Sequence, residues 1–474
     1  MGRFLSSDPH PVTGRPAPSG ASWIAAKPPV KLPPAAAAKA PVSSRVDFSA
    51  IRDEYNPVRK FAFYAALATL LVRLSVLSEV IASLTGVNTY LLYILAPPAI
   101  LGALLTGAVK RTFQQRAAYY WLGFFGWMIV ATPFSSWRGA STHLTLQYGE
   151  VEFGLLFVVG GLAVTWKEIR LIFYTFAVSG LLNLLLARLF MHVDYGRISL
   201  TEATTTIGNS NDLASHLLLV VPFLLFIVMD PKRGAFLRIA TLAPIGYAMW
   251  VIVGTASRGA VIALLAVTVF VLWRASMRQR ISILAFALLL AVVLPLALPK
   301  STLDRIWTFY GKENDEAEES ANSRSYLFRQ SVIFTLQHPL FGVGPGEFSD
   351  YEGGTSLKAG RLGNWHQTHC SWTQVSSECG IPGLLMFVFG VGSAVVLVNR
   401  TYRTARVKGN VEIANACFCY LVAMTGFLAS ISFLANAYRF YFPVMIGLAI
   451  SMSFVANQHM AGSATALPAA TRRA

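Results

Sequence analysis

The sequence predicts an all-α integral membrane protein with about twelve transmembrane helices. Of its 474 residues, 54% are hydrophobic and only 13% are charged, whereas a soluble domain carries about twice that charged fraction. A bilayer crossing takes about 20 apolar residues, so this apolar content is enough for roughly a dozen crossings. The composition therefore argues against a soluble enzyme. Basic cytoplasmic loops explain the net charge of +16, so we do not expect nucleic acid as a partner.

The first 57 residues differ in composition from the rest of the chain. They hold ten of the 23 prolines and an alanine run at 35–38, and they show no apolar periodicity. Such a segment cannot bury enough apolar surface to offset the entropy of ordering it. We expect a disordered, basic cytoplasmic arm. It is too long and too rich in proline for a signal peptide, so the first membrane helix is expected to direct insertion.

Apolar runs separated by short polar breaks begin near residue 60. Nine predicted helices fall within 58–299, a long polar segment occupies 300–381, three helices fall within 382–457, and a tail follows at 458–474. The twelve helices are expected near 61–84, 89–108, 117–134, 150–166, 171–190, 211–229, 239–255, 259–273, 281–299, 382–398, 411–435 and 440–456.

The basic residues in the short loops give the orientation. Alternate loops contain fifteen Lys and Arg, whereas the short loops of the other set contain only Arg138, Arg197, Arg258 and Arg439. Because Lys and Arg are retained in the cytoplasm, we expect both termini inside and the 300–381 segment outside. The fifteen are Lys110, Arg111, Arg116, Lys167, Arg170, Lys232, Arg233, Arg238, Arg274, Arg278, Arg280, Arg400, Arg403, Arg406 and Lys408.

The outer segment at 300–381 is too long for a simple connection, and such loops are usually functional. It contains an acidic stretch at 313–319, two short helical segments and a glycine-rich break at 341–346. The break lacks the preceding strand and the third spaced glycine of a dinucleotide-binding fingerprint. It is better explained as a tight turn.

Arg258 is the first candidate for substrate binding. It lies in the turn Gly254–Ala260 between two apolar runs of membrane length. A guanidinium at the outer interface can donate two parallel hydrogen bonds to a lipid-linked diphosphate. The alternative is a helix-end arginine whose charged head reaches the interface.

Three further outward arginines are candidates with ordinary alternatives. Arg197 follows Asp194 closely, so pairing of these two charges is weighed equally with substrate binding. Arg324 opens a helical segment before the glycine-rich break, where solvation on the surface is the alternative. Arg138 is included as a substrate contact because it too is retained outside.

His369 is the candidate for acid–base work. Histidine suits proton transfer near neutral pH, and His369 precedes the predicted tenth helix, which starts near Pro382. If the segment is helical, His366 and His369 share a face with Thr373, whereas Glu378 points about 180° away and is not expected to be a direct partner. The alternative is that both histidines are interfacial polar residues among aromatic neighbours.

Other polar residues in apolar surroundings are weaker candidates for a functional site. Two histidines three residues apart supply too few ligands for a metal site. Cys370 and Cys379 would lie about 13 Å apart on a helix, too far for a disulfide. Arg73 and Glu79 in the first helix are buried charges, which are functional candidates by default. They could instead offset each other or mark an irregular helix.

These motifs and their order resemble the O-antigen ligase and O-antigen polymerase superfamily over roughly residues 60–455. The run Glu378–Gly383 is similar to the family's Glu-x-Gly-x-x-Gly, with His369 at the family's spacing before it. The segment Gly208–Ala214 is similar to Gly-Asn-Pro-Asn-x-x-Ala. Cys370 replaces the Asn, Ser or Gln that usually follows the family's histidine. The remaining matching segments are Thr255–Ala260, Arg324 and His338–Phe348.

The resemblance implies a glycosyltransferase with a GT-C-like all-α fold in the bacterial inner membrane. It would move a glycan from an undecaprenyl diphosphate carrier to an acceptor hydroxyl on the outer side, without a cofactor or metal. The acceptor would be a growing glycan, lipid A core or a protein, and membrane lipid surrounds the chain. In this picture His369 is catalytic and Arg258, Arg197 and Arg324 bind the diphosphate, with His366 and Arg138 as further contacts.

Three alternatives stay open. A multi-pass transporter of polysaccharide or a small solute predicts charged or broken helices at the middle of the bilayer. A protein O-oligosaccharyltransferase would use the same donor with a different acceptor. A non-catalytic scaffold would retain only the fold. The sequence fixes neither the sugar nor the oligomeric state.

Overall fold

The computed structural model describes residues 54–465 with internal gaps. The predicted arm therefore lies almost entirely outside the described residues, as do most of the predicted ninth helix at 281–299 and the side chains of the acidic stretch at 313–319. The gaps fall at 195, 201–203, 205, 208, 276, 278–279, 282–283, 286, 289–297, 299, 301 and 304–314.

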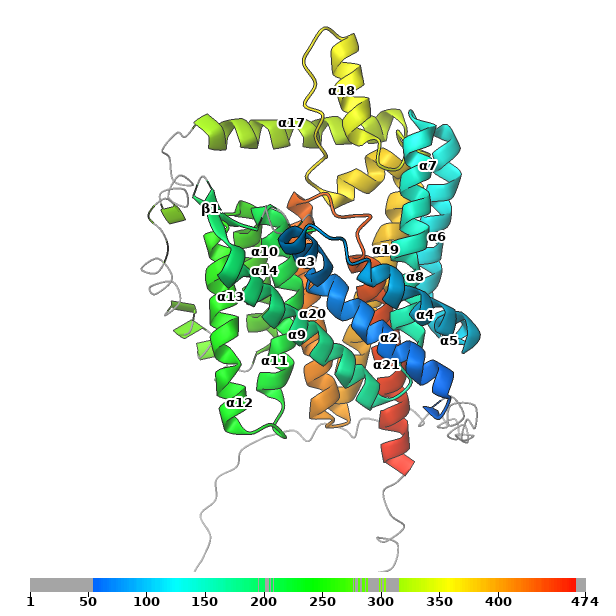
Figure 1. Cartoon of the computed structure of the whole chain (residues 1–474), viewed down its shortest axis with the longest axis vertical. Coiled ribbons are helices and arrows are strands. Elements are labelled where there is room, and N and C mark those ends of the chain that lie inside the picture. The colour runs from blue at the N-terminus through cyan, green and yellow to red at the C-terminus, as the bar shows by residue number, and fades with distance from the viewer. Residues whose placement is uncertain are drawn as a thin grey trace, which may run out of the picture. The chain divides into compact units, whose positions relative to one another are not determined.

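The described chain is a bundle of helices with one two-stranded hairpin (Figure 1). The hairpin pairs β1 (His192–Asp194) antiparallel with β2 (Arg197–Ser199). The helices are α2 Pro57–Leu74, α3 Leu77–Thr85, α4 Leu91–Leu105, α5 Ala108–Thr112, α6 Arg116–Ala131, η1 Thr132–Phe134, α7 Arg138–Gln147, η2 Tyr148–Phe153, α8 Gly154–Gly161, α9 Trp166–Phe190, α10 Ser210–Val220, α11 Pro222–Met229, α12 Ala235–Ala240, α13 Leu242–Gly254, α14 Arg258–Arg274, α17 Asp315–Gln337, α18 Phe348–Lys358, α19 Ser371–Val407, α20 Val411–Ser430, η4 Ile431–Phe433 and α21 Tyr441–Thr465.

The helices confirm an all-α, multi-pass membrane protein, although the count of twelve crossings is not confirmed. Within the described residues, six helices are long and apolar enough to span a bilayer, and a seventh span is counted if the bent pair α2–α3 is one crossing. Other predicted crossings correspond to shorter apolar helices such as α4 and α14. The six are Trp166–Phe190, Ser210–Met229, Ala235–Gly254, Ser371–Val407, Val411–Phe433 and Tyr441–Gly462.

Ion pairs hold several predicted basic loops together at one end of the bundle, which we call the basic end. Arg170 at the start of α9 lies 3.4 Å from Glu412 at the start of α20, and Lys232 lies 2.9 Å from the same carboxylate. Asp230 lies 3.6 Å from Arg233. The loops before α9, α12 and α20 therefore meet, as the alternation of basic loops predicts.

The first predicted helix is irregular, which accounts for its two charged residues. It breaks after Leu74, and α2 and α3 meet at 60°. Arg73 ion-pairs with Glu152 of η2 at 2.6 Å, and Glu79 accepts a hydrogen bond from the backbone N–H of Thr206 at 2.8 Å. Of the alternatives for Arg73 and Glu79, the irregular helix is confirmed, and each has a partner in another element.

Helix α19 begins at Ser371, eleven residues before the predicted start near Pro382. It continues through a break at Gly380, where φ is 71° and ψ is −177°. Pro382 lies in the first turn after this break and destabilises the helix little, because an N–H group at that position would have no helical partner. Other boundaries also differ, since α21 runs to Thr465 and the helix predicted at 150–166 is part of a longer run at 138–161.

Candidate functional site

The glycine-rich break at 341–346 is a tight turn that docks against the break in α19. Val343 N–H donates to Ser377 O at 2.8 Å, and Gly344 N–H donates to Glu378 O at 3.0 Å. Ile381 N–H donates to Pro339 O at 2.8 Å. The turn thus satisfies backbone groups that a broken helix would leave without partners. We call this region, with His369, the site end of the bundle.

The approach of the two backbones requires glycine at Gly380. A Cβ atom there would lie 2.1 Å from the carbonyl oxygen of Leu340. Its positive φ is also a conformation that residues with a Cβ rarely adopt. The Glu-x-Gly spacing in the sequence therefore has a structural cause in the docking of this turn.

The side chain of Glu378 hydrogen-bonds to the turn at 341–346. Its carboxyl group is fully buried, and its Oε2 accepts a hydrogen bond from the N–H of Gly346 at 3.0 Å. This agrees with the expectation that Glu378 is not a direct partner of His369. Arg138 is exposed at the start of α7, next to Ser136, whose N–H donates to Val343 O at 2.9 Å. Arg138 therefore lies beside the turn.

His369 lies in a non-helical segment just before α19. Its φ is 53°, and the helix starts two residues later, with Cys370 as its N-cap. The helical face that His366, His369 and Thr373 would share is consequently not formed. Burial, together with the positive charges of Arg324 and His366, lowers the pKa of His369 to about 4. Three of the predicted site residues are therefore close enough for their charges to interact.

The segment that carries the histidines is held by a buried carboxylate that sequence analysis missed. Glu352 of α18 is 1% exposed, and its Oε2 accepts from the N–H groups of Asn364 at 2.9 Å and Trp365 at 3.1 Å. Its Oε1 accepts from the hydroxyl of Tyr326 on α17 at 3.0 Å. A weak signal exists in the sequence, because two glycines follow Glu352 inside a helix, where glycine is disfavoured.

The packing around Gly353 explains why glycine follows Glu352 in this helix. A Cβ at Gly353 would lie 2.2 Å from Cδ2 of Trp365, so the tryptophan ring packs directly on the helix backbone. Trp365 itself has a φ of 53°. Helices α17 and α18 thus fix the start of the His366–His369 segment from one side, and α19 fixes its end.

Arg197 and Arg258 form a second group at the site end. Nε of Arg197 donates to Thr255 O at 3.2 Å, and Nη2 donates to Oδ1 of Asn211 at 2.7 Å. Arg197 therefore supports the turn that precedes Arg258, the exposed first residue of α14. The hairpin makes Asp194 the backbone partner of Arg197, but the guanidinium reaches across to α10 and α13.

The segment 209–214 begins with a helix cap. Oδ1 of Asn209 accepts from the N–H of Asp212 at 2.9 Å, which makes Asn209 the N-cap of α10. The next residues include Asn211, the partner of Arg197. The segment therefore both begins a membrane helix and positions an arginine.

The short helix η4 connects the two groups. A Cβ at Gly259, next to Arg258, would lie 2.9 Å from Cβ of Phe433. On the other side, Nε1 of Trp372 donates to Oγ of Ser432 at 3.0 Å, and Oγ of Ser371 donates to Leu434 O at 2.7 Å. Gly259, next to Arg258, and Ser371 and Trp372, just after His369, thus contact neighbouring residues of one short segment. No motif in the sequence predicts this role for residues 431–434.

Among the described residues, no three His, Cys, Asp or Glu side chains gather as a metal site would require. The four cysteines are free and buried. What the arrangement offers chemically is positive charge from arginines beside an imidazole at one end of a membrane bundle, which suits an anionic substrate.

Part of the chain that carries these residues matches a known family. Residues 243–388 match the family described as O-antigen ligase. No curated protein matches the chain. The matched region runs from α13 into α19 and contains Arg258, Arg324, His366 and His369, so the resemblance inferred from the motifs is confirmed there. This part of the chain is therefore similar to the O-antigen ligase family, as the motifs predict.

Proposed function

We propose that the protein transfers a glycan from an undecaprenyl diphosphate carrier to an acceptor hydroxyl on the outer side of the bacterial inner membrane. The observation that carries the proposal is that the matched domain contains Arg258, Arg324, His366 and His369, with Arg324 and His366 acting electrostatically on His369. In this orientation the basic end faces the cytoplasm, in keeping with the retention of Lys and Arg inside.

In the proposed reaction the acceptor oxygen attacks carbon 1 of the first sugar of the glycan. The bond from carbon 1 to the diphosphate oxygen breaks, and its electron pair leaves with the lipid diphosphate. Arg258, Arg197 and Arg324 would bind the diphosphate and stabilise the negative charge that grows on it. Because this is a single displacement, we expect inversion at carbon 1.

The lowered pKa of His369 gives it a specific role. With a pKa of about 4 the imidazole is neutral at pH 7, so a ring nitrogen can accept a hydrogen bond from the acceptor hydroxyl. A bound diphosphate would offset the charge of Arg324 and raise the pKa of His369. Its basicity would then increase only when the donor is present, which is when the proton must be taken.

The test is turnover by the purified protein with a defined lipid-linked oligosaccharide. We expect His369→Ala to lower kcat by about a hundredfold or more, and Arg324→Ala to weaken transfer. The matched control is Arg329→Ala, which removes an exposed arginine from the same helix and should leave turnover unchanged. Full turnover by correctly folded His369→Ala protein would contradict the site assignment.

A ligase and a polymerase differ only in the acceptor, so an experiment in cells is needed to distinguish them. Loss of a ligase leaves long chains on the carrier, whereas loss of a polymerase leaves single repeat units. The glycan profile of a deletion strain separates the two. Long glycans attached to a protein would indicate a protein O-oligosaccharyltransferase.

One observation favours the transporter alternative. The bent pair α2–α3, with Arg73 and Glu152 paired beside it, is the kind of broken helix that transporters use. Proteoliposomes without acceptor distinguish the two functions. A transporter would move labelled lipid-linked donor between leaflets, whereas the proposed transferase leaves the donor where it was added.

A further inference from the structure

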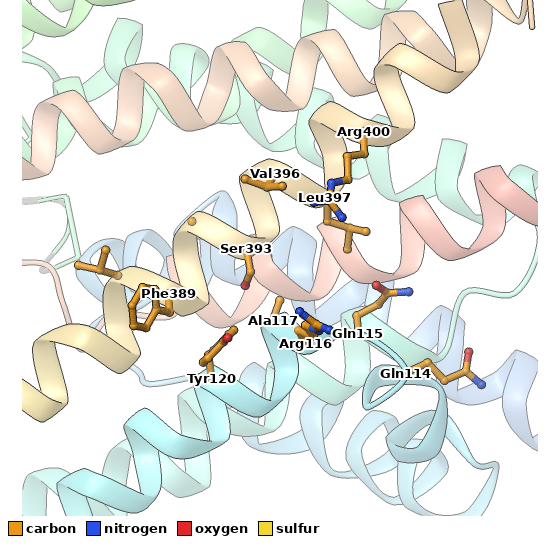
Figure 2. A pocket seen from close by; sticks show the side chains of 12 residues that line it. Gln114, Gln115, Arg116, Ala117, Tyr120, Phe389, Ser393, Val396, Leu397 and Arg400 are labelled. Atoms are coloured by element: carbon orange, nitrogen blue, oxygen red, sulfur yellow. The ribbon is translucent and has the colours of Figure 1, made fainter. Parts of the chain in front are cut away.

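A groove between α6 and α19 lies well away from the candidate site. It has a volume of about 700 Å³ and lies near the start of α6 and the later part of α19 (Figure 2). The two helices pack closely beside the groove, where a Cβ at Gly390 would lie 2.9 Å from Trp121. The groove is lined by Gln114, Gln115, Arg116, Ala117, Tyr120, Val388, Phe389, Gly392, Ser393, Val396, Leu397 and Arg400.

The groove belongs to the basic end. Nε of Arg111, on α5 just before α6, donates to Gly161 O at 2.7 Å. The adjacent Leu162 carbonyl accepts from Nη1 of Arg59, whose guanidinium also pairs with Glu168 of α9 at 2.7 Å. The start of α6 therefore lies beside the start of α9. Helix α19 ends at Val407, five residues before Glu412, which makes the ion pairs of the basic end.

Among the described residues, no carboxylate pairs with the positive charge in the groove. Arg116 from α6 and Arg400 from α19 enter it from facing helices (Figure 2), and neither makes an ion pair within the described residues. The lining contains no carboxylate. Arg116 is also the first residue of α6, whose N-cap Gln115 makes no side-chain hydrogen bond. A cation at a helix N-terminus is unfavourable unless an anion binds there.

The part of the groove away from the two arginines is apolar and exposed. Phe389 is 52% exposed and Val396 is 48% exposed, and the ring of Tyr120 lies 5.6 Å from that of Phe389. From Arg400 to Val388, α19 covers about 18 Å at 1.5 Å per residue. That length compares with the roughly 15 Å of hydrocarbon in one leaflet of the bilayer.

We propose that this groove binds an anionic phospholipid of the leaflet at the basic end. Arg116, Arg400 and the N–H groups at the start of α6 would hold the headgroup phosphate, and an acyl chain would lie along Val396 and Phe389. The groove has positive charge at one end and apolar surface along the rest of its length. This combination favours a lipid over a soluble anion. The proposal requires only that the chain spans a membrane, and it is independent of glycan transfer.

Native mass spectrometry of the full-length protein, titrated with phosphatidylglycerol or with phosphatidylcholine of the same acyl chains, tests this site. We expect preferential binding of phosphatidylglycerol. The double variant Arg116→Gln/Arg400→Gln should weaken that binding about tenfold or more, because each basic residue near the headgroups contributes about 1 kcal/mol. Both arginines are exposed, so the variant should fold, and its melting temperature checks this.

The matched control is Arg403→Gln/Arg406→Gln, which removes the same charge from exposed positions near the end of the same helix, outside the groove. It should keep wild-type lipid binding. The proposal is overturned if the groove variant binds phosphatidylglycerol as the wild type does, or if the control loses as much. Inorganic phosphate should not displace the lipid, and displacement by phosphate alone would overturn the assignment to a lipid.

Discussion

At the basic end of the bundle, Glu412 pairs with charged side chains from two other segments, whereas at the site end the buried Glu352 and Glu378 accept hydrogen bonds from backbone N–H groups. Glu412 at the basic end lies within ion-pair distance of Arg170 and Lys232. Glu352 at the site end accepts from two backbone N–H groups of the segment that leads to His369.

The difference shows how this fold can place positive charge beside a substrate. The ion pair that Lys232 makes with Glu412 is exposed on the lysine side, and such a pair contributes little stability. Buried carboxylates that bind backbone groups are costly to remove, and they fix loops that have no regular structure of their own. The site end therefore depends on a few residues, and substitutions there should have the larger effects.

The largest effect is expected for Gly380→Ala. The new Cβ would lie 2.1 Å from Leu340 O at a residue with φ of 71°, so the turn at 341–346 must move away from α19. We expect a loss of about 3 kcal/mol or more in unfolding free energy and a lower melting temperature in detergent. The control is Gly392→Ala on the same helix, where a Cβ would have no packing neighbour within 4 Å. Equal melting temperatures for the two variants would contradict the docking argument.

The next largest effect is expected for Glu352→Gln. The amide keeps one oxygen but adds an NH₂ group where the carboxylate accepted only hydrogen bonds, which should cost about 1–3 kcal/mol. Because Asn364 and Trp365 are released, the His366–His369 segment should loosen and turnover should fall. Asp350→Asn, an exposed change on the same helix, is the control for charge. Wild-type turnover in the Glu352 variant would show that this carboxylate does not position His369.

The sequence predicts the helices better than it predicts the contacts between them. Apolar runs locate α14 within one residue at each end, because membrane length and polar breaks are local signals. The start of α19 is missed, because the hydrogen bonds that replace those of the broken helix come from residues 339–344. Glu352 is missed for the same reason, since its backbone partners lie twelve residues along the chain. Arg324 and His369 could be selected because their residue types alone suggest the chemistry.

A change in pH dependence tests whether Arg324 acts on His369. With a pKa of about 4, His369 is neutral above that pH, so kcat/KM should fall only as the pH drops toward 4 and the imidazole gains a proton. Arg324→Gln removes a positive neighbour, which raises the pKa of His369 and moves this acidic limb to higher pH. The limb of kcat, which reports the donor complex, should lie above that of kcat/KM in the wild type. The control Arg329→Gln should leave both limbs unchanged, and an unmoved limb in the Arg324 variant would show that the two side chains do not interact.

The smallest effect is expected for Lys232→Gln at the basic end. Its ammonium lies 2.9 Å from Glu412, but the lysine side chain is 68% exposed. In the variant, Glu412 still accepts the hydrogen bond from the indole N–H of Trp166, at 2.9 Å. The variant should lose about 0.5 kcal/mol or less, and the loss should shrink at high salt because the pair is screened. Unfolding at low and high salt measures both quantities. If Lys232→Gln destabilises the protein as much as Glu352→Gln does, the ion pairs hold the basic end as firmly as the buried carboxylates hold the site end, and the contrast between the two ends fails.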